Sequence, residues 1–278
     1  MTNRAMRLGK KPFPITRRRQ LAAHMARHQA LMLDLQQPPA SADWQQNLEN
    51  WGMLGNDQYG DCTVAAACHA IMCWTLNVQG QPAAIDELEA RQAFQLINPR
   101  FVYNPEAPSN SVGGKSVFLQ DTIHWWYEHG IAGRKIDAYG LLPFQNLDSV
   151  KRAIAYFGAC CIGIQLPSDE ADPDHPDAAI GSSDWDVATS TLTGPGTDAD
   201  PNLGHCVLGI AYDAEGLNVV TWGAVKRMSW DFLNKYMDEA FVMLSLNDWV
   251  APNGEAPSGL NADQLKAHGP KLCPNWVS

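Results

Sequence analysis

The feature that most constrains this chain is a polar turn that runs directly into an apolar helix. Residues 56–74 have the sequence NDQYGDCTVAAACHAIMCW. Gly60 allows the backbone to turn sharply, and Asp61 belongs to the residue types whose side chain caps the first turn of a helix. The pattern therefore predicts a helix that begins at Cys62, with the thiol in its first turn.

Helical patterns dominate the first half of the chain and strand patterns dominate the second. After the helix at 62–74, helices are predicted near 85–96, 116–129, 147–157 and 230–236. Strands are predicted at 160–166, 206–212, 217–222 and 240–246. A long polar loop spans residues 167–203, and loops of that length are usually functional or disordered. This order indicates an α+β fold with a helical half and a sheet half.

The charge of the chain is strongly asymmetric along its length. The net charge is −10, yet residues 1–40 hold eight Lys and Arg and a single acid, Asp34. We expect a basic arm at 1–40, extended at first and helical over 16–36, then a globular domain at 41–249 and a tail at 250–278. The arm could bind nucleic acid, an anionic membrane surface, or an acidic protein face, the chain's own included. The acidic remainder argues against an enzyme that acts on nucleic acid.

The cysteines and the apolar runs indicate where such a chain resides. Seven cysteines cannot form a complete disulfide framework, and their clustering indicates free thiols in a reducing compartment. No apolar run approaches the ~18 residues of a membrane span. The first 20 residues lack the apolar core of a signal peptide. We therefore expect a cytoplasmic or virion-associated protein, with secretion by another route left open.

The position of Cys62 favours a reactive thiol. A helix macrodipole stabilises negative charge at the first turn, which lowers the pKa of a thiol there. The charge of Asp61 opposes that effect if the carboxylate lies near the sulfur. A thiolate in this position is a candidate nucleophile and needs a general base beside it. His205, 143 residues later at the start of a predicted strand, is the candidate base.

Two other interpretations of the cysteines stay open. The first is that Cys62 is a buried, inert thiol, since free cysteines are among the most buried side chains. The second is a metal site that would use Cys68, His69 and Cys73. No C-x-x-C pair accompanies them, and a structural zinc needs four convergent ligands. We therefore expect no metal or other cofactor, and we expect His69 to belong to the core.

Three segments together resemble the papain-like cysteine peptidase superfamily. NDQYGDC precedes the predicted helix, VKRAIAYFGACCIGI forms a helix–strand unit, and GHCVLGIAYD with LNVVTWG follows. Within that superfamily the Asp-Cys pair is closest to the bacteriocin-leader-peptidase branch. The whole pattern is also similar to uncharacterised bacterial and phage proteins with a GND..GDC…GH…VTWG pattern. The resemblance covers residues 50–246 and implies a papain-like fold, in which a helical half carrying the cysteine packs against an antiparallel sheet carrying the histidine.

The resemblance also implies roles for individual residues. Cys62 matches the nucleophile and His205 matches the general base. Asn56 stands at the position of the glutamine in the oxyanion hole, where the Cys62 N–H would be the second donor. Trp222 and the glycine after it match the family's Trp-Gly pair.

One family residue has no equivalent at its expected position. The asparagine that orients the histidine falls on Val220, whose side chain cannot bond an imidazole. Asn218 lies two residues earlier on the same strand face and is the candidate orienter. Asp186 and Asp213 are further candidates.

Two functions are consistent with these residues. In the first, the chain is a thiol hydrolase that cleaves a peptide or amide bond in a peptide or protein substrate, with residues 167–203 bordering the site. In the second, the fold is catalytically degenerate and serves as a binding or structural module, such as a virion or effector component, docked on a protein partner through residues 1–40. A preformed, solvent-open contact between Cys62 and His205 would argue against the second function.

Overall fold

The computed structural model describes residues 7–13, 37–46, 48–113, 117–143, 146–167, 184–186 and 198–268. The helices are α2 (Cys62–Gln79), α3 (Glu87–Ile97), the 3₁₀ helix η1 (Pro108–Asn110), α4 (Leu119–Glu128), α5 (Leu147–Phe157), α6 (Trp230–Tyr236), α7 (Leu246–Trp249) and α8 (Ala262–His268). The strands are β1 (Ala42–Asp43), β2 (Ala138–Leu141), β3 (Cys160–Pro167), β4 (Ala199–Tyr212), β5 (Gly216–Thr221), β6 (Ala224–Ser229) and β7 (Met237–Leu244).

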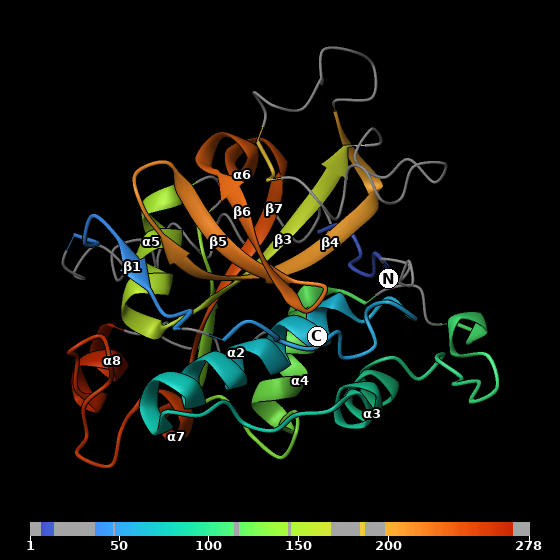
Figure 1. Ribbon diagram of the computed structural model, residues 1–278, viewed down its shortest axis with the longest axis horizontal. Coiled ribbons are helices and arrows are strands. Elements are labelled where there is room, and N and C mark those ends of the chain that lie inside the picture. The colour runs from blue at the N-terminus through green and yellow to red at the C-terminus, as the bar shows by residue number, and fades with distance from the viewer. Residues whose placement is uncertain are drawn as a thin grey trace.

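The strands form one antiparallel sheet, and most of the helices lie on one side of it. The strand order is β2-β7-β3-β4-β5-β6, with β1 paired to β4. Figure 1 shows this sheet above a layer that contains α2, α3, α4 and α7. The α+β arrangement predicted from the sequence is therefore confirmed.

Helix α2 forms the centre of the core. Every residue from Cys62 to Thr75 is buried, because β4 and β5 contact the helix on the sheet side and α3, α4 and α7 contact it elsewhere. Trp74 stacks on Trp126 of α4 at 5.6 Å between ring centroids. The helix ends at Gly80, whose φ of 75° lies in the left-handed region that glycine adopts at little cost.

The prediction that the Asp61 side chain caps α2 is wrong. Asp61 occupies the N-cap position, but its side chain makes no capping hydrogen bond. The first turn is instead held by the Asp61 carbonyl, which accepts from the N–H groups of Val64 and Ala65. The Asp61 side chain is fully buried, and burial raises the pKa of its carboxyl well above the usual range.

The other predicted elements are confirmed or corrected individually. The helices at 147–157 and 230–236 have the predicted bounds as α5 and α6. Strand β4 begins at Ala199, inside the loop predicted at 167–203. Its first residues are mostly exposed and polar, so the sequence pattern did not indicate a strand there. The short strands β2 and β6 were not predicted. The helix expected over 16–36 lies outside the described residues.

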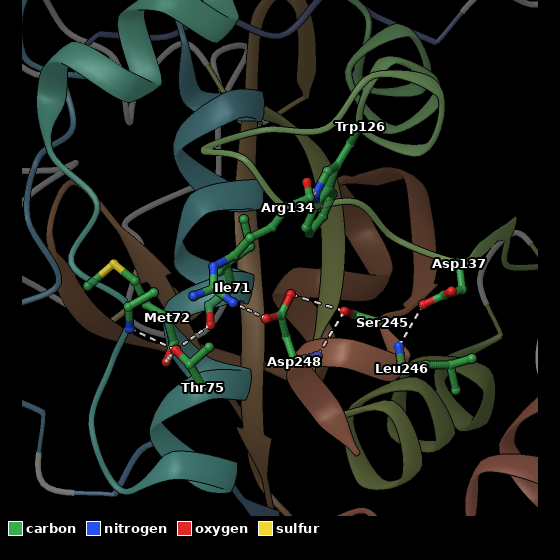
Figure 2. Close-up of polar contacts among 10 residues, drawn as sticks. Ile71, Met72, Thr75, Trp126, Arg134, Asp137, Ser245, Leu246 and Asp248 are labelled. Atoms are coloured by element: carbon green, nitrogen blue, oxygen red, sulfur yellow. Dashed lines mark hydrogen bonds and ion pairs between the residues drawn. The ribbon is translucent and has the colours of Figure 1, made fainter. Parts of the chain in front are cut away.

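A polar cluster links the end of β7 to the helical layer, as Figure 2 shows. Asp248 of α7 accepts hydrogen bonds from the Arg134 guanidinium and, at 3.1 Å, from the Ser245 hydroxyl. Asp248 is buried, whereas the Arg134 side chain is about one-third exposed. The indole N–H of Trp126 donates to the Arg134 carbonyl at 3.1 Å, so the cluster also reaches α4.

Within the described residues, no helix is both long and apolar enough to span a membrane.

Candidate active site

Cys62 begins α2 at the boundary between the helical layer and the sheet. Its side chain is buried, with a residue exposure of 1%. Burial raises the pKa of the thiol to about 12, although the backbone N–H groups of Cys206 and Gly9 lower it in part. The thiol therefore lies against β4, at the residue that directly follows His205.

His205 lies on β4, opposite Ile164 of β3, and is completely buried. Its Nε2 lies 2.7 Å from Thr221 Oγ1 on β5. Its Nδ1 has no hydrogen-bond partner among the residues that the structure describes. Burial lowers the pKa of His205 to about 3, with further lowering by the charges of Lys226 and Lys10. Burial therefore favours the neutral imidazole in this arrangement, with Nε2 bonded to Thr221.

Aromatic side chains enclose the His205 ring. Trp222 stacks on it, with 4.2 Å between ring centroids and 13° between planes, and Trp185 meets it edge-on at 6.5 Å. Trp222 and Gly223 form the two-residue loop between β5 and β6, and both have positive φ, 47° and 75°. Two consecutive left-handed residues make the turn that suits a tight hairpin. This hairpin places the indole over the imidazole.

Asn218, the residue predicted to orient His205, has other hydrogen-bond partners. Asn218 donates to Gln45 Oε1 at 3.3 Å and accepts from Arg227 at 3.2 Å. The other two candidates also have partners elsewhere: Asp213 pairs with Arg227, and Asp186 accepts from Ser229. Thr221 supplies the hydrogen bond instead.

Asn56 lies in the turn before α2, is buried, and contacts the N-terminal segment. Its side-chain amide donates to the Arg7 carbonyl at 3.2 Å and to the Tyr59 carbonyl at 3.5 Å. The Trp222 indole N–H donates to the same Arg7 carbonyl at 3.2 Å. Two donors at the site, one of them the residue expected in an oxyanion hole, therefore converge on one backbone carbonyl oxygen of this chain.

Residues 7–13 run between Val117 and β4, beside the turn that leads into Cys62. The backbone of this segment pairs with Val117 on one side, through the Gly9 carbonyl and the Lys11 N–H, at 3.1 and 2.9 Å. On the other side, the Lys10 N–H donates to the Gly204 carbonyl of β4 at 3.1 Å. Figure 1 shows the segment, in dark blue, beside β4. The extended conformation predicted for the start of the arm is confirmed for these residues.

Glycines allow the close fit of this segment. A Cβ at Gly9 would lie 2.0 Å from the Gly60 carbonyl oxygen, and one at Gly204 would lie 2.1 Å from the Lys10 carbonyl oxygen. Real Cβ atoms do not approach backbone oxygens so closely, so each position requires glycine in this arrangement.

His69 and the other described thiols, those of Cys68, Cys73, Cys160, Cys161 and Cys206, are buried in the core, and Cys273 lies outside the described residues. His69 Nε2 lies 3.1 and 3.0 Å from the carbonyl oxygens of Trp51 and Gly52, and burial lowers its pKa to about 4. Within the described ranges, no group of three or more His, Cys, Asp or Glu could hold a metal ion. Burial raises the pKa of the Cys206 thiol well above its usual range, and the nearby thiols of Cys161 and Cys62 act in the same direction.

No protein-family model matches the chain, and no curated protein matches it. Several solved structures are similar to it in fold. Xylellain, a cysteine protease from Xylella fastidiosa, has a TM-score of 0.51 and 13% identity over 86% of this chain and 91% of its own. Procathepsin L 3 of the Tenebrio molitor larval midgut has a TM-score of 0.51 and 13% identity over 87% and 76%. The ragweed pollen cysteine protease Amb a 11, in its proform, has a TM-score of 0.50 and 14% identity over 77% and 69%. The fold is therefore papain-like, as the sequence predicted.

Proposed function

We propose that the protein is a papain-like thiol hydrolase that cleaves a peptide or amide bond, with Cys62 as nucleophile and His205 as general base. The observation that carries this proposal is the position of Cys62, at the start of a buried helix and against the strand that holds His205. The His205–Thr221 hydrogen bond and the stacked Trp222 support it, because they fix the imidazole that a thiol hydrolase needs.

The reaction begins when the thiol proton of Cys62 passes to His205 Nδ1. The sulfur then bonds to the carbonyl carbon of the substrate, and the carbonyl oxygen becomes an oxyanion. As the carbon–nitrogen bond breaks, His205 returns the proton to the leaving amine, and a thioester remains on Cys62. Water attacks the thioester, gives a proton to His205, and releases the acid product together with the regenerated thiol.

Thr221 and Asn56 assist this reaction without exchanging protons with the substrate. The Nε2–H tautomer of His205 donates to Thr221 Oγ1, which leaves the Nδ1 lone pair to act as the base. The Asn56 amide and the Cys62 N–H are the donors for the oxyanion. That Asn56 donates to the Arg7 carbonyl supports this role, because it shows the amide bonding a carbonyl at the site.

Residues 7–13 hold the proposed enzyme in a closed form. With Gly9 beside Cys62 and the thiol buried, a substrate reaches the sulfur only after this segment moves away. In this proposal residues 7–13 of the basic arm bind the chain's own body, which is one of the partners that the charge of the arm predicts.

The test is to open the site and then look for hydrolysis that depends on the two residues. The full-length Lys10→Glu variant, which opposes two carboxylates, is incubated with a mixed peptide library, and new peptide ends are identified by mass spectrometry. We expect cleavage that disappears when Cys62→Ala or His205→Asn is added. Equal cleavage with and without Cys62→Ala would overturn the proposal.

A non-catalytic binding or structural module is the second candidate. It is favoured by the burial of both residues and by the absence, within the described part of the chain, of a hydrogen bond between Cys62 and His205. A variant with an exposed Cys62 that cleaves no peptide in the library would support this candidate instead.

A further inference from the structure

Lys10 occupies a buried site made for one ammonium group. Its Nζ lies 2.7 Å from Asp238 Oδ2, 3.0 Å from Glu239 Oε1 and 3.0 Å from the Lys11 carbonyl oxygen. An ammonium has three N–H donors, and these three acceptors match them in number. The side chains of Lys10, Asp238 and Glu239 are 0%, 4% and 1% exposed.

Two of the three acceptors, the carboxylates, lie on the central sheet, whereas the Lys11 carbonyl belongs to the N-terminal segment itself. Asp238 and Glu239 are consecutive residues at the start of β7, and Glu239 lies opposite Gly163 of β3. The side-chain amide of Gln165, two residues further along β3, donates to Asp238 Oδ2 at 3.0 Å. Because the carboxylates are on a strand of the central sheet, they keep their positions when the N-terminal segment leaves.

The space for the lysine side chain depends on Gly163. A Cβ at this position would lie 2.8 Å from Lys10 Cε, 2.7 Å from Glu239 Cγ and 2.8 Å from Asp238 Oδ1. Any side chain there would compete with the lysine for the same volume. Gly163, Asp238, Glu239 and Gln165 are called the lysine site below.

The lysine site is one residue away from the proposed chemistry. Gly9, which precedes Lys10, packs against Gly60, two residues before Cys62, and the Lys10 N–H donates to the carbonyl of Gly204, which precedes His205. A substrate that reaches Cys62 must displace this segment and pass through the place that Gly9 now occupies. A substrate residue that lies where Lys10 lies then has its side chain directed at the lysine site.

We propose that the lysine site selects substrates that carry a lysine directly after a glycine close to the attacked bond, and that Lys10 and Gly9 of this chain occupy these positions in the closed form. This inference rests on the proposed function, since it names the substrate class of the same site. The close approach of Gly9 to the Gly60 carbonyl accounts for the glycine, and the two carboxylates account for the lysine.

The geometry separates lysine from other side chains. An uncharged side chain of similar length would leave two buried carboxylates without their cation, which is strongly unfavourable. Arginine carries a planar guanidinium with five donors and does not match three acceptors around one nitrogen. Lysine is therefore expected to be preferred over both norleucine and arginine.

The experiment measures how peptides protect Cys62 in the opened full-length chain. In the Lys10→Glu variant, iodoacetamide labelling of Cys62 is followed by peptide mapping. Lys11→Glu is the matched control, because it makes the same charge change at an exposed neighbour that rests on the Phe118 ring. We expect at least tenfold faster labelling in Lys10→Glu than in Lys11→Glu.

Peptides with the sequence of residues 7–13, RLGKKPF, are then added to the opened chain. The parent peptide should restore protection of Cys62. Norleucine or arginine at the position of Lys10 should weaken protection at least tenfold, whereas norleucine at the position of Lys11 should have little effect. In a Gly163→Ala or Asp238→Asn/Glu239→Gln background, the preference for lysine should disappear. If Lys10→Glu fails to fold, Gly9→Ala provides a second way to displace the segment with all the acidic residues retained.

Equal protection by the lysine and norleucine peptides would overturn the inference and leave the Lys10 ion pairs as a purely structural contact. This readout needs no catalysis, so it separates the inference from the proposed function. Lysine-dependent protection without hydrolysis of any peptide would support the lysine site but overturn the proposed hydrolase function. Hydrolysis without a preference for lysine beside glycine would leave the hydrolase but overturn the inference.

Discussion

His205 Nε2 lies 2.7 Å from Thr221 Oγ1, so a hydroxyl on the neighbouring strand holds the imidazole. Thr221 directly follows Val220, the position on which the asparagine of papain-like peptidases falls. A hydroxyl can accept the Nε2–H as an amide oxygen does, and a fixed partner selects the tautomer of a histidine. The stacked Trp222 indole shields this hydrogen bond from water.

Replacing Thr221 by valine should weaken the base without removing it. Valine has the shape of threonine but cannot accept the Nε2–H, and the loss of one buried hydrogen bond costs about 1–3 kcal/mol. In the opened Lys10→Glu background we expect hydrolysis to fall by roughly 10- to 100-fold. The measurement is the pH profile of peptide hydrolysis, because a tautomer change shifts the profile while a simple loss of folded protein only scales it.

Thr221→Ser is the matched control for that prediction. Serine retains the hydroxyl, so activity and pH profile should remain within a few-fold of the opened chain. A Thr221→Val variant with the same pH profile as Thr221→Ser would show that the hydroxyl does not orient His205.

The ionisation of Cys62 should change when residues 7–13 leave. Burial raises the pKa of this thiol to about 12 in the closed form, and only the thiolate reacts with iodoacetamide. The labelling rate of the wild-type chain should therefore keep rising with pH up to strongly alkaline values. In Lys10→Glu, exposure removes the main cause of the shift, so the rate should level off at a lower pH. Superimposable pH profiles for the two chains would contradict the closed form.

The sequence was sufficient to predict those parts of the fold that depend on local pattern and on the order of motifs. The apolar run after Cys62 predicted a buried helix start, and the helix–strand unit at 147–166 predicted α5 and β3 with nearly the observed bounds. His205 was singled out by the family order of the motifs, and Asn56 by its place in the turn before the helix. Their roles as general base and oxyanion donor stay predictions.

The contacts that complete the site could not be predicted, because they join segments far apart in the chain. Lys10 and Asp238 are separated by 228 positions, and only the charge asymmetry indicated that the arm would meet acidic residues. Thr221 was not expected to contact His205, because the family pattern places the orienting residue one position earlier, at Val220. One local signal was available: Gly223 directly after the apolar run 217–222 allows the positive φ that a tight hairpin turn requires.

The two buried histidines should make the protein less stable in mild acid. Burial lowers the pKa of His69 from 6.5 to about 4, so the unfolded chain binds more protons than the folded chain between these values. The contribution of His69 to the free energy of unfolding is therefore fully present above pH 6.5 and is lost as the pH falls toward 4. The loss for this residue amounts to roughly 3 kcal/mol. Urea unfolding at pH 7 and pH 5 should show the lower stability at pH 5, and His205 should act in the same direction.

The variant His69→Gln tests the source of that loss. Glutamine keeps an N–H donor near the Trp51 carbonyl but does not titrate in this range, so the difference between pH 7 and pH 5 should shrink. His129→Gln, at an exposed histidine, should leave the difference unchanged. An undiminished difference in His69→Gln would assign the acid sensitivity to other groups.

Asp248 should be the most sensitive point of the link between β7 and the helical layer. Its carboxylate is buried and bonded to both Arg134 and Ser245 (Figure 2). Asp248→Ala leaves these donors without their acceptor, so we expect a loss of about 2 kcal/mol in the free energy of unfolding, measured by urea denaturation. Asp263→Ala is the matched control, because Asp263 forms an exposed ion pair with Lys266 at 3.9 Å, and such pairs contribute little. Equal effects of the two variants would show that the Asp248 cluster does not link the two layers.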